Sequence, residues 1–485
     1  MNPVLIKRGS ILGWVVLYLL IAGALQLYVS HPWDTDTAYH VVLGKLIREH
    51  GILHAFPWTP FSWLADHYAD KELLFHLLFV PLASVNWIIA AKIVGTLTGT
   101  ALLLAIYLIL RSAGVRLAGL WALVPLSASV IFIFRFALVR PHLLSITLAF
   151  LYLWAAARGR LVILAAVSAI YPWAYVAFWQ IPFLLLLALE TALVLSGERL
   201  QWRPAAVTIA GLTLGVVVHP NATNLLHLNW VQMVDVLFRN LFNVREGFDM
   251  GGEFLPLPVA AWVQGLLISV LMIIAAVVYA WRNRRKDTMS LAFAFAALGF
   301  FALTIRTARF LEYFVPFSAA AMALISRSVR WRFLLQAILG ASIIYTGWVG
   351  SNTLLNLSKA PNNMPLQVAS ILQEQIPTGS QIFTTDWEET GILMLTLPDR
   401  HFMVALDPTF FYLKDPELYR LWYRLIHQAP PGLALTIRQR FRARYVLGLN
   451  KPKWFRFYNR LGSEHGVRTL LVSQWILLDL GSPPL

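Results

Sequence analysis

Two acidic residues follow the first long apolar stretch of the chain, in the sequence HPWDTDTAYH at residues 31–40. Asp34 and Asp36 stand at the start of a segment with helical periodicity, and an aspartate that caps a helix is worth about 1 kcal/mol relative to alanine. One cap uses one acid, not both. A remaining carboxylate can take a proton from a reacting group or help to bind a divalent cation. A catalytic and a purely structural role are therefore both open for this pair.

Arginines at the ends of other apolar runs form a second set of candidate functional residues. They are Arg135, Arg140, Arg306 and Arg309. An arginine near hydrocarbon costs roughly 2.5–3.5 kcal/mol on insertion scales, so it usually has a partner. A phosphate group suits the planar guanidinium. Ion pairs with Asp or Glu, or contacts with lipid headgroups, are the alternatives.

A metal site is a weaker alternative. The sequence WDTD contains a D-x-D pattern, and GFDMGGEFLP at residues 247–256 adds two acids beside glycines. Such carboxylates, with a histidine, could bind a divalent ion that steadies a phosphate. The candidate ligands are Asp34, Asp36, Asp249 and Glu253, with His31 or His54. Because D-x-D arises often by chance, no cofactor is expected with certainty.

The composition of the 485 residues indicates a polytopic α-helical membrane protein. Hydrophobic residues make up 58% of the chain and charged residues 13%, and many apolar runs approach the roughly 20 residues that a spanning helix needs. Lys and Arg outnumber Asp and Glu by 39 to 24. Most arginines of the first 350 residues flank apolar runs, as topology signals do, so nucleic acid is not the expected partner. The chain has no cysteine, which excludes disulfides and thiol chemistry.

The apolar runs predict about eleven spans with the N-terminus inside and the C-terminus outside. They lie near residues 11–29, 89–110, 117–134, 141–157, 161–176, 181–197, 204–219, 258–281, 289–306, 311–326 and 333–350. The loops assigned to the inside are short and basic, as the positive-inside rule requires, for example 111–116 and 157–160. Residues 73–86 are apolar but too short to cross, so we expect them at the outer interface.

The chain changes character after residue 350, which divides it into a membrane domain (1–350) and a second domain (351–485). Charges become frequent, and short alternating or β-branched pieces, which suggest strands, alternate with helical ones. The strand-like pieces are QIFTTDW, HFMVALD, RYVLGL and TLLVSQWILLDL. This pattern predicts a small extracytoplasmic α/β domain. Its acidic and aromatic sequences TTDWEETG (384–391) and ALDPTFFY (405–412) are interpreted as loops at strand ends, with acceptor binding as the alternative.

The first outer loop, within residues 31–88, resembles that of the GT-C superfamily of membrane glycosyltransferases, which includes aminoarabinose transferases and protein O-mannosyltransferases. The segments that carry the resemblance are DTAY (36–39), KLIREHG (45–51) and HYADKELLFHLLF (67–79), and more loosely FRFALVRPH (134–142), YPWAYVAFWQ (171–180), HPNATNLL (219–226) and TIRTARFLEYFVPF (304–317). The C-terminal region lacks the WWDYG motif of oligosaccharyltransferases, which argues against transfer of a whole oligosaccharide to asparagine.

The resemblance implies transfer of a sugar, with inversion, from a polyprenyl-phosphate donor to a protein, lipid or glycan acceptor outside the cytoplasm. It implies Asp36 as general base, with Asp34 as substitute or helper, and the four arginines as ligands of the donor phosphate. Candidate acceptor- or sugar-binding residues are Tyr39, His40, Glu72 and Glu253. The expected location is a bacterial inner membrane, in contact with membrane lipid, with the active site facing the periplasm. A transporter and a non-catalytic scaffold are the competing interpretations.

Overall fold

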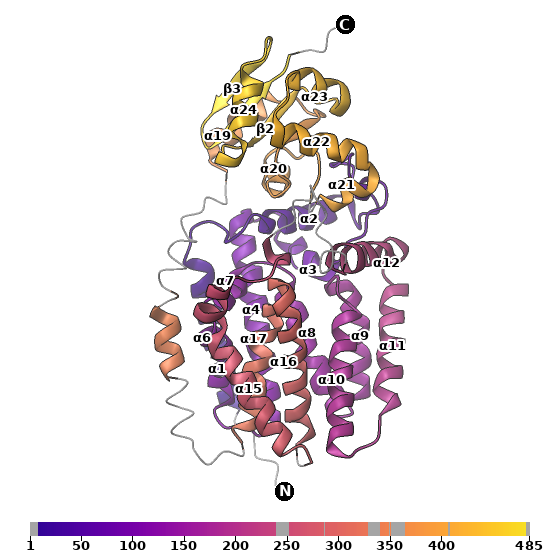
Figure 1. The fold of residues 1–485 in the computed structure, drawn as a ribbon, viewed down its shortest axis with the longest axis vertical. Helices are drawn as coiled ribbons and strands as arrows, with labels where there is room; N and C mark the ends of the chain where they lie inside the picture. Colours follow the sequence, from indigo (N-terminus) through magenta and orange to yellow (C-terminus); the bar gives the residue numbers. More distant parts are fainter. Residues whose placement is uncertain are drawn as a thin grey trace.

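The computed structural model describes residues 8–238, 252–285, 287–327, 340–348, 350, 364–405 and 408–481. Long helices form a body, short helices lie across one end of it, and an α/β unit caps that end (Figure 1). The sequence positions of the long helices follow the apolar runs. The predicted boundary after residue 350 adjoins residues outside the described ranges, and residues 333–339 and 349 of the predicted span 333–350 also lie outside them.

The helical body is built from elements whose bounds follow the predicted spans within a few residues. They are α1 (Arg8–Leu27), α4 (Trp87–Ser112), α5 (Ala118–Trp121), α6 (Val124–Ala128), α7 (Val130–Ala137), α8 (His142–Ala157), α9 (Leu161–Ala174), α10 (Gln180–Ser196), α11 (Trp202–Val217), α14 (Val259–Ala261), η5 (Trp262–Leu266), α15 (Leu267–Arg282), α16 (Thr288–Arg306) and α17 (Leu311–Ile325). The span predicted at 117–134 is broken into α5, α6 and α7. Ser129 interrupts it because its extended backbone lets its hydroxyl cap α7.

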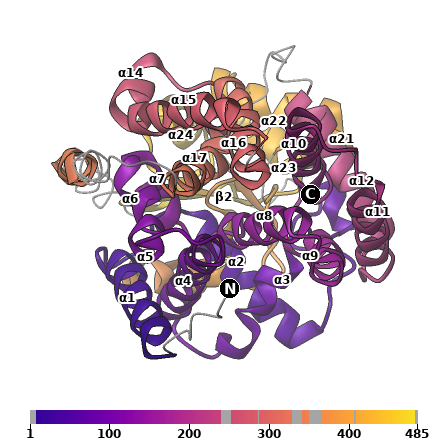
Figure 2. The same ribbon diagram turned by 90° about the horizontal axis from the view of Figure 1, so that it is seen from below.

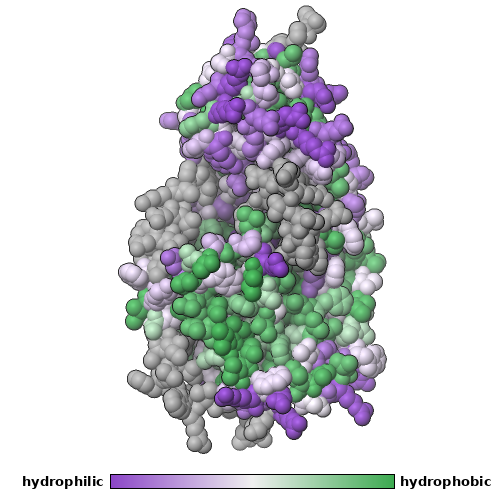
Figure 3. All heavy atoms as spheres, viewed as in Figure 1, coloured by the Kyte–Doolittle hydropathy of each residue, from purple (hydrophilic) through white to green (hydrophobic). Residues whose placement is uncertain are grey.

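On the face shown in Figure 3, apolar residues cover the middle of this body and polar residues gather toward its two ends. Leu187, Leu214 and Leu271 are each more than half exposed on it, as expected for side chains that face lipid. Four helices of the described residues are long and apolar enough to cross a membrane, or up to six with two bent pairs. The chain is a membrane protein, and the count of eleven spans stays a prediction.

Short helices lie across the end of the body that faces the α/β unit. They are α2 (Asp36–His50), η1 (Trp63–Ala65), α3 (Leu73–Leu77), η2 (Val80–Leu82), α12 (Ala222–Asn229) and, between broken spans, η3 (Trp230–Phe238), η4 (Gly252–Phe254) and η6 (Ala308–Phe310). Figures 1 and 2 show α2 and α3 under the α/β unit and at the end of the bundle. Residues 73–86 thus form short pieces at this end and do not extend into a long helix.

The α/β unit contains one four-stranded sheet of order β1-β2-β4-β3, in which β1 and β2 are parallel and the other pairs antiparallel. Its elements are α19 (Leu366–Gln375), β1 (Ile382–Thr384), α20 (Thr390–Thr396), α21 (Thr409–Lys414), α22 (Pro416–Gln428), α23 (Leu433–Phe441), β2 (Tyr445–Leu449), η7 (Pro452–Trp454), α24 (Phe455–Gly462), β3 (Arg468–Val472) and β4 (Trp475–Asp479). The sequence HFMVALD had suggested a strand, and its described part forms none. Phe402 N–H donates instead to Trp58 O, 2.7 Å away in the first outer loop.

The α/β unit and the first outer loop are packed as one body. Phe61 of the loop contacts Phe411 and Phe441 in the core of the unit, with ring centroids 5.8 and 5.9 Å apart. Helix α20 lies against α2 so closely that a Cβ on Gly391 would be 2.6 Å from the backbone nitrogen of Tyr39. The start of α2, which carries Asp36, is thereby held between the membrane body and the outer unit.

This contact predicts that Gly391→Ala destabilises the protein by about 1–3 kcal/mol, because backbone atoms cannot move away as a flexible side chain would. Thermal unfolding of the purified protein in detergent measures the effect. Gly13→Ala in α1 is the matched control, since no atom lies within 4 Å of its added Cβ. Equal unfolding midpoints for the two variants would contradict the close packing of α20 on α2.

The predicted orientation can be tested because the chain has no native cysteine. We expect Glu374→Cys, exposed on α19, to react with a membrane-impermeant maleimide in intact cells. We expect Arg199→Cys, exposed in the basic turn between α10 and α11, to react only after the membrane is permeabilised. The opposite labelling pattern would place the α/β unit inside the cell.

Candidate active site

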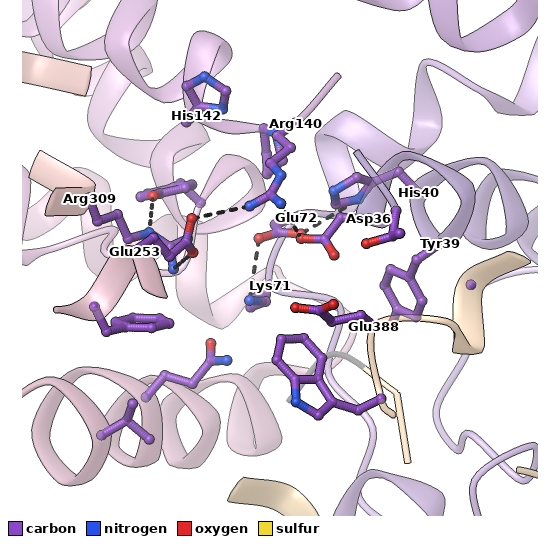
Figure 4. A pocket seen from close by; sticks show the side chains of 18 of the residues that line it. Asp36, Tyr39, His40, Lys71, Glu72, Arg140, His142, Glu253, Arg309 and Glu388 are labelled. Atoms are coloured by element: carbon purple, nitrogen blue, oxygen red, sulfur yellow. Dashed lines mark hydrogen bonds and ion pairs between the residues drawn. The ribbon is translucent and has the colours of Figure 1, made fainter. Parts of the chain in front are cut away.

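A cavity of about 250 Å³ lies between the helical body and the α/β unit. Its lining includes Asp36, Arg140 and Glu253, and the α/β unit contributes Glu388 (Figure 4). These residues come from four separate segments of the chain. The packing of the α/β unit on α2 therefore encloses Asp36, Glu253 and three of the four arginines that the sequence singled out.

Asp34 has a structural role at the start of α2. Its carboxylate accepts hydrogen bonds from Thr37 N–H at 3.3 Å, from the Thr37 hydroxyl and from Arg140 Nε, and its side chain is 10% exposed. Burial alone would raise the pKa of Asp34, but Arg140 and Thr37 bring the pKa below its usual range. Asp34 is thus ionised, and Thr37 and Arg140 hold its carboxylate at the start of α2.

Asp36, in contrast to Asp34, keeps its carboxylate partly exposed to the cavity. Its side chain is 37% exposed, and Arg140 Nη2 lies 2.9 Å from its Oδ2. Enclosure in the cavity, together with the nearby charges of Asp34, Glu253 and Glu388, outweighs the attraction of Arg140 and raises the pKa of Asp36 to about 6. A carboxyl with this pKa is a competent general base near neutral pH.

Three arginines from separate elements meet on the Glu253 carboxylate of η4. Arg135 of α7 lies 3.0 Å from it, and Arg140 of the turn before α8 and Arg309 of η6 each lie 3.2 Å from it. Arg135 also pairs with Glu312, which is fully buried. Glu253 thus occupies a place where three guanidinium groups bind one anion. The arginines keep the pKa of Glu253 well below its usual range although burial opposes this.

Arg306 is not brought to this cluster. It is the last residue of α16 and is exposed. The chain leaves the helix at Thr307, in extended conformation, so the guanidinium groups of Arg306 and Arg309 do not follow one helical face. Arg306 is not among the residues that line the cavity.

Tyr39, His40 and Glu72 also line the cavity. His40 forms a buried pair with His76, which does not line the cavity. His40 Nδ1 lies 2.8 Å from His76 Nε2, and His76 Nδ1 lies 2.7 Å from Asp70 Oδ2. Burial lowers the pKa of His40 to about 3, so its ring is neutral. Burial opposes ionisation of Glu72, but Lys71, with Nζ 3.4 Å away, helps lower its pKa to about 2.

Two sets of residues are candidate metal ligands. Asp34 and Glu253 are paired with arginines, an environment that disfavours a cation, and Asp249 lies outside the described residues. His40, Glu72 and His76 offer ligand atoms within 4.8 Å of one another. Asp70 orients the His76 ring as carboxylates do behind metal-bound histidines. This second set fits a divalent ion, and the sequence interpretation missed His76 and Asp70 because their spacing follows no helical face.

An apolar recess continues from the cavity toward the helical body. Its walls include Val176, Met233 and Phe310, and it shares Tyr175 and Arg309 with the cavity. Arg309 donates to the Tyr175 hydroxyl at 3.2 Å. The arginine cluster therefore stands at the junction of a polar chamber and an apolar one.

The helical body, the flat helices on it and the cap above them form a GT-C-like fold. Solved structures with this fold that resemble the chain include ArnT from Cupriavidus metallidurans in the apo state (12% identity, TM-score 0.58, 98% of this chain and all of that one) and ArnT bound to undecaprenyl phosphate (12%, 0.62, 97% and 99%). A third is the mycobacterial arabinofuranosyltransferase AftD (14%, 0.54), of which the chain covers 40%.

Comparisons of the sequence alone add no relative to these structures. No protein-family model and no curated protein sequence matches it. At 12–14% identity the solved structures show the fold and leave the reaction to be argued from the cavity.

The different surroundings of the two aspartates predict different effects on stability. Asp34→Asn should destabilise the protein by about 1–3 kcal/mol, because the hydrogen bonds of a charged carboxylate with Thr37 and Arg140 are weakened. Asp36→Asn should cost less than about 1 kcal/mol, because its pair with Arg140 is partly exposed. Thermal unfolding of both variants in detergent measures this. A larger loss for Asp36→Asn would reverse the assigned roles.

Proposed function

We propose that the chain is a glycosyltransferase that transfers a sugar from a polyprenyl-phosphate donor to an acceptor outside the cytoplasm. The observation that carries the proposal is that Asp36, a carboxylate open to the cavity, stands beside a cluster of three arginines at the mouth of an apolar recess. Transfer from a polyprenyl-phosphate donor requires a general base, a group of cations that binds the phosphate and an apolar space for the prenyl chain.

Asp36 is the proposed general base. An acceptor hydroxyl must lose its proton as it attacks the anomeric carbon, and a carboxylate within hydrogen-bonding distance can accept that proton. Asp36 has the exposure and the raised pKa for this step. Asp34 is engaged by Thr37 and Arg140, so its part is to hold Arg140 and the start of α2.

Arg135, Arg140 and Arg309 are the proposed ligands of the donor phosphate. A guanidinium group can donate two parallel hydrogen bonds to a phosphate. Its positive charge stabilises the negative charge that develops on the leaving group. In the structure the carboxylate of Glu253 takes this place, so a phosphate would share or replace its hydrogen bonds. The adjoining apolar recess, of about 30 Å³, marks where the prenyl chain would begin, and its walls would have to move apart to admit an isoprene unit.

The proposed reaction inverts the anomeric configuration, since it is a single displacement with base and leaving group on opposite sides of the sugar. ArnT, which shares the fold, has been solved with undecaprenyl phosphate bound, which supports a carrier of this class. The expected site is the periplasmic face of a bacterial inner membrane. The sugar and the acceptor are left open.

A transfer assay with a panel of polyprenyl-phosphate sugars tests the proposal. With a productive donor, Asp36→Asn should reduce turnover by about 10²–10⁴-fold, with thermal stability near that of wild type. The rate of the native enzyme should fall about tenfold per pH unit below pH 6, because protonation removes the base, and should level off above that pH.

Glu49→Gln, on the exposed end of α2, is the matched control for loss of a carboxylate from the same helix. Its turnover and pH profile should equal those of wild type. Unchanged turnover in Asp36→Asn would remove the assigned base. Absence of transfer from every donor, with no binding of undecaprenyl phosphate, would favour a scaffold role.

A further inference from the structure

We propose that Trp387 and Glu388, in the loop between β1 and α20, form a sugar-binding subsite in the roof of the cavity. This inference rests on the proposed function, because it assigns the part of the cavity that holds the transferred or accepting sugar. The sequence interpretation had favoured this loop as a connection at a strand end.

The loop reaches the cavity from the α/β unit. Trp387, Glu388 and Gly391 all line it, and the Glu388 side chain is 42% exposed. Figure 4 shows the Glu388 carboxylate on the same side of the cavity as Asp36 and Tyr39, across from Arg309. The two carboxylates are close enough for Glu388 to raise the pKa of Asp36.

Two buried acids anchor this loop on either side of Trp387 and Glu388. Asp386 and Glu389, with side chains 3% and 0% exposed, both pair with Lys451, whose Nζ lies 2.9 and 3.1 Å from them. Lys451 Nζ also lies 3.5 Å from Glu388 Oε2, so the same lysine holds the partly exposed carboxylate directly. Glu389 also accepts from Leu449 N–H at 3.0 Å. Buried ion pairs add little net stability, so this network is better explained as a device that fixes the loop in one conformation.

The two presented side chains have the chemistry of a carbohydrate site. An indole ring offers a flat apolar surface to the C–H face of a sugar, and an ionised carboxylate accepts hydrogen bonds from hydroxyl groups. The charge of Glu388 is offset by Lys451, 3.5 Å away, so the roof has no surplus of cations and attracts a phosphate less than the wall of three guanidinium groups does. A glycosyl phosphate would therefore place its phosphate at the arginines and its sugar under the loop.

Binding measurements separate the two ends of such a ligand. The probes are undecaprenyl phosphate alone and undecaprenyl phosphate linked to each of several common sugars, added to the full-length protein in detergent. Methyl glycosides of the same sugars, added at saturating undecaprenyl phosphate, probe a sugar that comes from the acceptor. The variants are Trp387→Ala and Glu388→Gln, and Glu374→Gln, exposed on α19, is the matched control.

We expect at least one sugar-bearing probe to bind the native protein more tightly than its sugar-free counterpart. Trp387→Ala and Glu388→Gln should each weaken binding of that sugar-bearing probe by about tenfold or more, while the affinity for bare undecaprenyl phosphate stays unchanged. Loss confined to the lipid-linked sugars identifies the donor sugar, and loss confined to methyl glycosides identifies the acceptor. Glu374→Gln should leave every value unchanged.

Equal effects of the loop variants on bare and sugar-bearing probes, or no effect of any sugar, would overturn the subsite. If the native protein fails to bind undecaprenyl phosphate, the proposed donor class fails instead, and the methyl glycosides, then added without the lipid, still report on the loop. Lys451 is assigned as a positioning residue. Lys451→Met should lose the gain in affinity that the sugar provides, and Lys451→Arg should keep most of it. If the lysine were purely structural, its loss would lower the unfolding temperature and leave the ratio of the affinities for sugar-bearing and sugar-free probes unchanged.

Discussion

The guanidinium of Arg140 is the interaction on which the rest of the site depends. It binds Asp34 and Asp36 at the start of α2 and Glu253 of η4, three carboxylates that would repel one another without it. Removing a charge from water is costly, so a buried cation among several acids is held only where every partner is placed well. Arg140 therefore sets the distance between the membrane body and α2, and through α2 the position of the outer unit.

The parts of the fold that depend on local sequence could be predicted. Apolar runs give α4, α8, α10 and α16 because helix formation in lipid satisfies every backbone group within the segment. Asp36, Arg140 and Arg309 could be selected because charged residues at the ends of such runs need partners. The contact between Asp34 and Thr37 is also local, because an aspartate at the start of a helix accepts from a backbone N–H two or three residues later.

The remaining parts depend on contacts between distant segments, which no local pattern reveals. The sequence HFMVALD has strand-like composition, yet Phe402 N–H bonds to Trp58, some 340 residues away, and the described part forms no strand. Arg306 lies only three residues before Arg309, but the extended backbone at Thr307 separates the two. Trp387 and Glu388 reach the cavity only through the packing of α20 on α2, which depends on the absence of a side chain at Gly391.

The shared core of Phe61, Phe411 and Phe441 has a consequence for how such a protein can be divided. An α/β unit produced on its own would carry an apolar hollow where Phe61 belongs, and a truncated membrane half would lose the surface that steadies α2. Neither portion is a self-sufficient module, so grafting this cap onto another GT-C body would require its first outer loop to travel with it.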